Sequence, residues 1–158
     1  MQDTCRNLYY NARKAAGLTQ ERWAEVLGIS VESVRLYESG ANMPGDEIVL
    51  RMAEVAGQQI VCYWHLLNKS RAAAALLPEV PRKPLPEAVC QLLYRLRDFA
   101  EKHRDDDLLW ISANGRVDPG EQERVFAQIA DELDGIVQAA MCVKFAESAD
   151  PEGGRTCT

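Results

Sequence analysis

Two short helical patterns joined at a single glycine, within residues 19–38, constrain the fold of this chain more than any other feature. Apolar side chains recur at helical spacing from Trp23 to Leu27, and Gly28 follows directly. A glycine just past the last periodic residue commonly ends a helix in the left-handed conformation. Ser30 can then cap a second helix. The stretch therefore predicts two helices with a tight turn between them.

The second of these helices has two distinct sides. Val34 and Tyr37 face inward at helical spacing, and Ser30 supplies the cap just as Thr19 does for the first helix. An outward face of this kind enters the major groove of DNA in helix-turn-helix proteins. The residues on or near that face are Val31, Glu32, Ser33, Arg35 and Leu36.

The residues around the turn resemble the lambda repressor/Cro-like (XRE) helix-turn-helix pattern, because small, aliphatic and polar positions occur together at the correct offsets. The similarity covers roughly residues 6–69. It implies an all-α, five-helix DNA-binding domain that binds a two-fold operator as a homodimer. A helical hairpin without any DNA function is the alternative. The matching residues are Gly17, Leu18, Thr19, Gln20, Ala24, Leu27, Gly28, Ser30, Val34, Glu38 and Gly40.

The resemblance also implies roles for individual side chains. Gln20 would bind a phosphate, the helix beginning near Ser30 would read bases, and Asn42 in the next loop would donate to the DNA backbone. That loop contains no Lys or Arg, which predicts weak salt dependence. The DNA-contacting set is predicted to be Thr19, Gln20, Ser30, Val31, Glu32, Ser33, Arg35, Leu36 and Asn42.

Arg13 and Glu38 occupy the positions at which the resembled family has a structural ion pair. The pair would tie the first helix, expected over residues 4–16, to the end of the base-reading helix. The alternative is two separate surface charges, since an exposed pair contributes only ~0–1 kcal/mol.

Core positions are expected along the other helices of residues 1–69. Asp46 is expected to cap a fourth helix that ends at Gly57, and residues 58–69 are apolar on more than one face, which predicts packing both inward and against a partner. His65 has no second ligand at the i+4 position, so it is expected to be a partly buried polar residue, not a metal ligand. The expected core residues are Leu8, Ala12, Ala15, Ile48, Leu50, Met52, Ala53 and Val55.

The proline-rich stretch 70–86 is expected to be a stiff linker, with a polyproline ligand as the alternative. Beyond it, residues 87–147 contain two amphipathic helices, 87–104 with His103 on its apolar face and 119–146 capped by Asp118. They predict a helical hairpin and an oligomerisation domain. Residues 148–158 are expected to be a flexible tail.

The connection between these helices imitates part of an EF-hand calcium loop. Asn114, Gly115 and Glu121 match that pattern, but Trp110 and Ser112 occupy its first and third ligand positions. A tight turn at residues 114–115 is therefore the better interpretation, and no metal or other cofactor is expected.

Composition and charge exclude several classes. The chain has 158 residues, a formal net charge of −6 and five scattered cysteines without a C-x-x-C pair. No membrane span, signal peptide or catalytic constellation is evident, so a cytoplasmic protein that is not an enzyme is expected. The first seventy residues carry seven basic and eight acidic side chains, which is nearly neutral for a DNA-binding domain.

Two functions remain at this stage. The first is a sequence-specific transcriptional regulator that binds double-stranded DNA as a homodimer, with any small-molecule or protein effector unknown. The second is a protein–protein adaptor or antitoxin-like protein in which the hairpin domain binds a partner.

Overall fold

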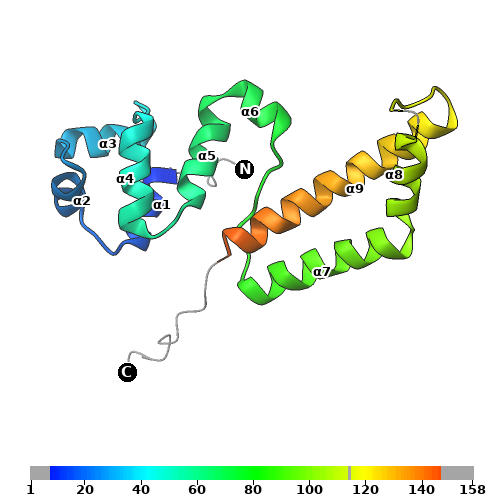
Figure 1. Ribbon diagram of the computed structural model, residues 1–158. Coiled ribbons are helices and arrows are strands. Elements are labelled where there is room, and N and C mark those ends of the chain that lie inside the picture. The colour runs from blue at the N-terminus through cyan, green and yellow to red at the C-terminus, as the bar shows by residue number, and fades with distance from the viewer. Residues whose placement is uncertain (1–7, 114, 147–158) are drawn as a thin grey trace. The chain divides into compact units, whose positions relative to one another are not determined.

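The computed structural model describes residues 8–113 and 115–146, which form nine helices and no strand. The predicted all-α fold is confirmed. The chain divides into two compact units, unit one up to Leu77 and unit two from Pro78 onward (Figure 1).

Unit one contains a five-helix bundle followed by one short helix. Its first helix, α1, packs against three of the others, α3, α4 and α5. The bounds are α1 Leu8–Ala15, α2 Gln20–Leu27, α3 Val31–Ser39, α4 Asp46–Ala56, α5 Ile60–Lys69 and α6 Arg71–Leu76. The core consists of Tyr9, Ala12, Trp23, Ala24, Leu27, Val34, Val49, Met52, Ala53 and Val61.

The two helices around the tight turn are capped as the sequence predicts. The Thr19 hydroxyl accepts a hydrogen bond from the Arg22 N–H at 3.2 Å, and the Ser30 hydroxyl accepts one from the Ser33 N–H at 3.0 Å. Gly28 lies between them with φ +66°, a conformation that strains any residue with a Cβ. These three residues set the direction in which α3 leaves the turn.

The inward face of α4 differs from the expectation. Leu50 is 55% exposed and Val55 is 38% exposed, whereas Val49 is buried. Residues 48–50 are three consecutive apolar residues, so periodicity alone does not choose which one faces the core. The cap was also wrong, because Gly45 occupies that position and Asp46 is the first helical residue.

The inward face of α1 also differs. Ala15, expected in the core, is exposed, while Tyr9 and Arg13 are buried. Side-chain pairing explains both exceptions: Tyr9 bonds to His65 and Arg13 bonds to Glu38. Hydrophobic patterning does not register polar groups that are buried because they have partners.

Unit two consists of an antiparallel helix pair with a third helix in the connection. The long helices are α7 Leu85–Glu101 and α9 Glu121–Lys144, and α8 Arg104–Ser112 contacts both. The sequence did not predict α8. His103 was wrongly placed on the apolar face of the first long helix, since it has φ +53° and its side chain is exposed.

The start of α9 also needs correction. Gly120 precedes its first residue, and Asp118 does not cap the helix. The Asp118 backbone N–H instead donates to Gln122 Oε1 at 2.9 Å. The predicted turn residue Asn114 and the tail at residues 148–158 lie outside the described residues, whereas Gly115 is left-handed with φ +75°.

The proline-rich stretch is more ordered than a simple linker. Residues 71–76 form α6, which packs on α5, and Val80 is only 3% exposed. The Gln138 side-chain amide donates to the Glu79 carbonyl at 2.8 Å, and the Cys142 thiol lies 3.8 Å from the Pro81 carbonyl. Residues 79–81, the strap, therefore pack against α9 within unit two.

Candidate nucleic-acid interface

The predicted DNA-contacting residues come from three neighbouring places in unit one: the start of α2, the first turns of α3 and the loop after α3. On α3, Glu32, Arg35 and Leu36 are exposed, while Val31 and Ser33 are half-buried. Thr19, Ser30 and Asn42 are exposed as well. The outward side of α3 thus presents acidic, basic, hydroxyl and apolar side chains over a short surface.

Several polar groups on this surface already have partners. The Ser30 and Ser33 hydroxyl oxygens lie 2.9 Å apart, in addition to the capping bond. Arg35 Nη1 lies 3.6 Å from Glu32 Oε2, with the two side chains 58% and 68% exposed. Such exposed pairs contribute little stability and exchange readily for another partner. Arg35 therefore remains available to a ligand that competes with Glu32.

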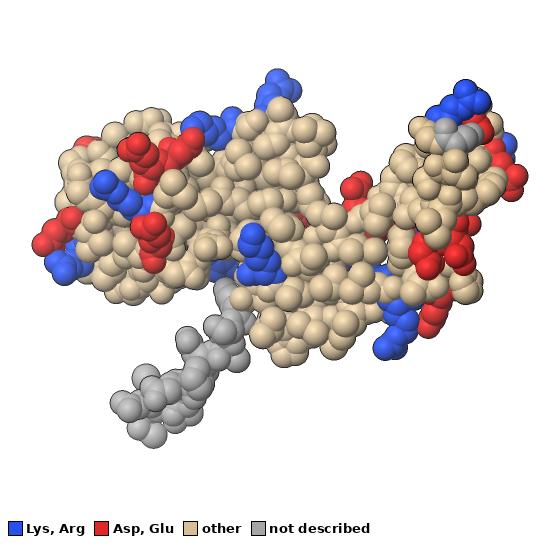
Figure 2. Space-filling model, in the orientation of Figure 1, with Lys and Arg blue, Asp and Glu red and all other residues tan. Residues whose placement is uncertain are grey.

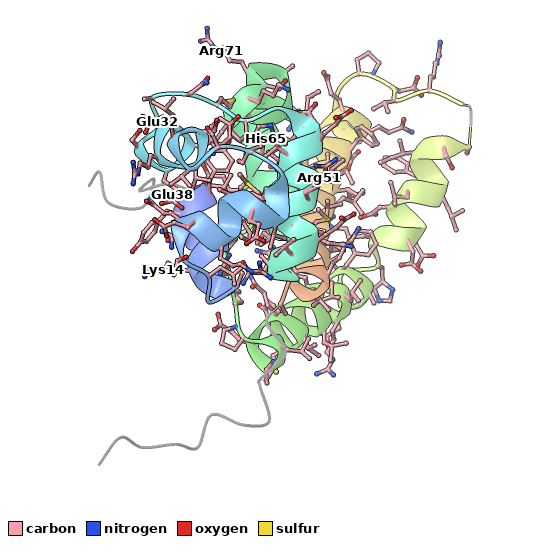
Figure 3. All side chains as sticks on the ribbon, turned by 90° about the vertical axis from the view of Figure 1, so that its left-hand side faces the viewer. Lys14, Glu32, Glu38, Arg51, His65 and Arg71 are labelled. Carbon is pink, nitrogen blue, oxygen red and sulfur yellow. The ribbon has the colours of Figure 1, made fainter. Side chains whose placement is uncertain are left out.

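The other end of α3 is fixed by a buried ion pair. Arg13 and Glu38 form two hydrogen bonds, one of them from Nη2 to Oε2 at 3.0 Å, and each side chain is 7% exposed. Arg13 also donates to the Leu18 carbonyl at 2.9 Å. The hydrogen bond to Glu38 raises the pKa of Arg13 above its usual value. The pair joins α1, the loop before α2 and the last turn of α3; Glu38 is labelled in Figure 3.

Gln20 belongs to the same network. Its amide nitrogen donates to Glu38 Oε2 at 2.8 Å, and the side chain is half-buried. This bond turns the Gln20 amide toward the end of α3. A contact from Gln20 to a phosphate must therefore use its second N–H or replace the bond to Glu38.

A second polar cluster, at the junction of α1, α4 and α5, was not foreseen; its Tyr9 and His65 are buried, whereas its Asp46 and Lys69 are exposed. His65 is 4% exposed, with Nδ1 2.8 Å from the Tyr9 hydroxyl and Nε2 3.1 Å from Asp46 Oδ1. Lys69 also donates to Asp46 at 2.6 Å. The Lys69 hydrogen bond and then that of His65 hold the pKa of Asp46 below its usual value. No spacing signal marks this cluster, because its members come from three helices.

Replacing His65 with alanine is expected to destabilise unit one by about 1–3 kcal/mol, the usual effect of breaking a buried hydrogen-bonded group. Native-state hydrogen exchange of the α1, α4 and α5 amides measures this change. The control is His103→Asn, which changes an exposed histidine to a residue that tolerates positive φ. Equal effects of the two substitutions would contradict a structural role for His65.

The electrostatics of this surface are nearly balanced. Figure 2 shows acidic and basic side chains interspersed over α2 and α3, with no continuous basic area on the face in view. Besides Arg35 on α3, this surface has Arg22 near the start of α2, and Arg22 bonds to Glu25. A surface of this kind attracts phosphates weakly, so any affinity for DNA would depend more on contacts with bases.

Neither metal sites nor membrane spans are found in the part of the chain that the structure describes. No group of three or more His, Cys, Asp or Glu side chains there could hold a metal ion. No helix within those residues is long and apolar enough to cross a bilayer.

Comparison with known proteins agrees with the geometry of α2 and α3. A family model described as Helix-turn-helix matches residues 10–60. No curated protein and no solved structure matches the chain. The matched family is a DNA-binding regulatory domain and not an enzyme family. Residues 10–60 therefore form a helix-turn-helix domain of the lambda repressor/Cro-like family.

Proposed function

We propose that this chain is a sequence-specific transcriptional regulator that binds a two-fold DNA operator as a homodimer, with α3 in the major groove. The observation that carries the proposal is the capped α2–Gly28–α3 unit, which leaves Glu32, Arg35 and Leu36 in the first turns of α3 exposed. Helix-turn-helix proteins read base edges with that part of the second helix, and two-fold operators match protein dimers.

The side chains on α3 suggest which bases are read. Arg35 is the one cation on this helix and fits a bidentate contact with guanine O6 and N7. Val31 fits a thymine methyl group, and Glu32 accepts a hydrogen bond from cytosine N4. The DNA backbone is then contacted by Thr19, Gln20, Ser30 and Asn42.

Selection from random duplex DNA tests this function most directly. A regulator should enrich a palindrome with half-sites about one helical turn apart. On the selected site, Arg35→Ala is expected to cost ~1–3 kcal/mol at one or two base pairs. Gln20→Ala should weaken all sequences about equally. Binding isotherms on matched and mismatched duplexes measure both effects.

Arg22→Ala is the matched control, because Arg22 is an exposed α2 arginine paired with a glutamate, as Arg35 is on α3. It should leave the base preference unchanged. Unchanged affinity and preference in Arg35→Ala would show that α3 is not the reader.

An adaptor or antitoxin-like protein is the second candidate, favoured by the exposed apolar side chains of unit two and the net charge of −6. In that case unit two binds a different protein, and DNA binding is secondary. Failure to enrich any sequence, even at low salt, would favour this second function.

A further inference from the structure

Unit two exposes more apolar surface than a helix pair of its size can leave in water. Its fully buried apolar side chains are few and mostly small, and the large core cluster belongs to unit one. Side chains on all three helices are instead between 39% and 70% exposed. The largest of these are Leu85, Leu93, Tyr94, Leu96, Leu109, Trp110, Phe126, Leu133 and Val137.

Most of these side chains form one stripe on each long helix. On α9 the stripe begins at Phe126 and continues through Leu133 and Val137, with spacings of seven and four residues. The small residue Ala130 lies between the first two, and Ala140 follows Val137. Such a 3–4 alternation is the pattern of a helix seam that packs against another helix. On α7 the corresponding stripe is Leu85, Val89, Leu93 and Leu96.

Polar contacts hold α7 and α9 together. Lys102 lies 3.3 Å from Glu132 across the pair, and the Arg95 guanidinium lies against Gly135, where a Cβ would come within 2.3 Å of Nη1. The strap also bonds to α9 through Gln138. The first two contacts mark the sides of α7 and α9 that face each other, and the strap covers α9 next to Gln138.

Helix geometry places both stripes to the same side of these contacts. Each residue advances about 100° around a helix. On α9, a rotation around the helix axis that starts at Glu132 passes the buried Ile129 and then reaches Leu133. On α7, a rotation in the same sense starts at Arg95, passes the buried Ala88 and then reaches Leu96. Because α7 and α9 are antiparallel, equal senses carry both stripes to the same side. Together the two stripes make up the apolar side of the α7–α9 pair, the open face.

We propose that the open face binds the open face of a second copy, so that α7 and α9 of both chains form a four-helix bundle. This inference rests on the dimeric regulator proposed above and names the surface that makes its dimer. A two-helix layer with one apolar side completes a bundle core when a two-fold axis supplies the other layer.

The size of the open face suits this occupant. Its six large exposed side chains present roughly 500 Å² per copy, which with the half-buried members approaches the ~800 Å² per partner of stable interfaces. Apolar patches of this size are at the upper end of what typical monomers expose, and they are often functional.

The charges of α9 favour self-association in an antiparallel arrangement. Its five carboxylates all lie between Glu121 and Asp134, and Lys144 is the one charged residue in its last ten positions. Antiparallel α9 helices therefore place the acidic half of each opposite the uncharged half of the other, with Lys144 near the carboxylates of its partner. A parallel arrangement would put like charges together.

Sedimentation equilibrium of the full chain without DNA tests the open face. The unmodified chain is expected to be a dimer at micromolar concentration. Leu93→Asp on α7 and Val137→Asp on α9 should each raise the dissociation constant at least ~100-fold, because each places a charge in an apolar interface. Tyr94→Asp is the matched control, since Tyr94 is the next residue on α7, is 70% exposed and points away from the open face. It should change the constant less than threefold.

Circular dichroism of the monomeric variants shows whether helix is retained. If an aspartate variant loses helix, Leu93→Ala and Val137→Ala replace it, because alanine preserves helix while removing interface area, and roughly tenfold weaker association is then expected. The proposal would be overturned if the unmodified chain were still a monomer at roughly 100 micromolar. It would also be overturned if Tyr94→Asp raised the dissociation constant as much as Leu93→Asp. Sedimentation is measured without DNA, so it is independent of the selection experiment. A dimer that enriches no operator contradicts the regulatory function and leaves the open face standing. A monomer that enriches an operator contradicts the open face and the dimer but leaves base reading by α3 standing.

Discussion

Replacing Arg13 with alanine is expected to remove about 3–5 kcal/mol from the stability of unit one, the usual effect of breaking a buried ion pair. The substitution leaves the Glu38 carboxylate, 7% exposed, with Gln20 as its remaining side-chain donor. It also removes the donor to the Leu18 carbonyl. Hydrogen exchange of the α1 and α3 amides should show the loss, with the last turn of α3 opening first.

Two further variants separate the buried charge from the contact itself. Arg13→Met combined with Glu38→Met should recover most of the lost stability, because well-packed apolar residues often replace a buried pair without cost. Arg22→Ala breaks an exposed pair with Glu25 and should cost only ~0–1 kcal/mol. A double variant as unstable as Arg13→Ala alone would show that the carboxylate is not the source of the penalty.

Trp23→Ala is expected to cost about 3–5 kcal/mol, because it removes a large side chain that is completely buried in the core of unit one. The melting temperature of a domain this size falls by about 4–8 °C per kcal/mol, so much of unit one should be unfolded near physiological temperature. Thermal unfolding followed by circular dichroism measures the change.

Trp110 provides the comparison, since it is 48% exposed on α8 in unit two. Trp110→Ala should destabilise the chain far less and leave the exchange of unit one amides unchanged. Similar losses for both tryptophans would mean that burial does not determine the difference.

The part of the fold that sequence predicted best is the part governed by local chemistry. Thr19, Gly28 and Ser30 act within one or two turns of their own position, and the helix starts and the turn they define were predicted correctly. The family resemblance depends on the same local pattern. Two residues far apart in sequence, Arg13 and Glu38, were paired only through that resemblance.

The rest depends on information that periodicity does not contain. Periodicity allows any one of residues 48–50 to face the core, and tertiary packing buries Val49. His65 is buried because Tyr9 and Asp46 reach it from two other helices. The change of direction before α8 occurs at His103, which adopts the left-handed conformation although it is not a glycine. No simple sequence rule anticipates this.

The contact between Glu32 and Arg35 has a consequence for how α3 would search a genome. Arg35 already holds a carboxylate at 3.6 Å, so any DNA site must displace an internal competitor before it gains the arginine. The Glu32 charge also repels any phosphate that approaches Arg35, whereas a guanine offers this arginine two neutral acceptors in the plane of the guanidinium. Removing the competitor, as in Glu32→Gln, would therefore increase occupancy of random DNA more than occupancy of the operator. Glu32 would in this way lengthen the time that the protein spends on its correct site relative to all others.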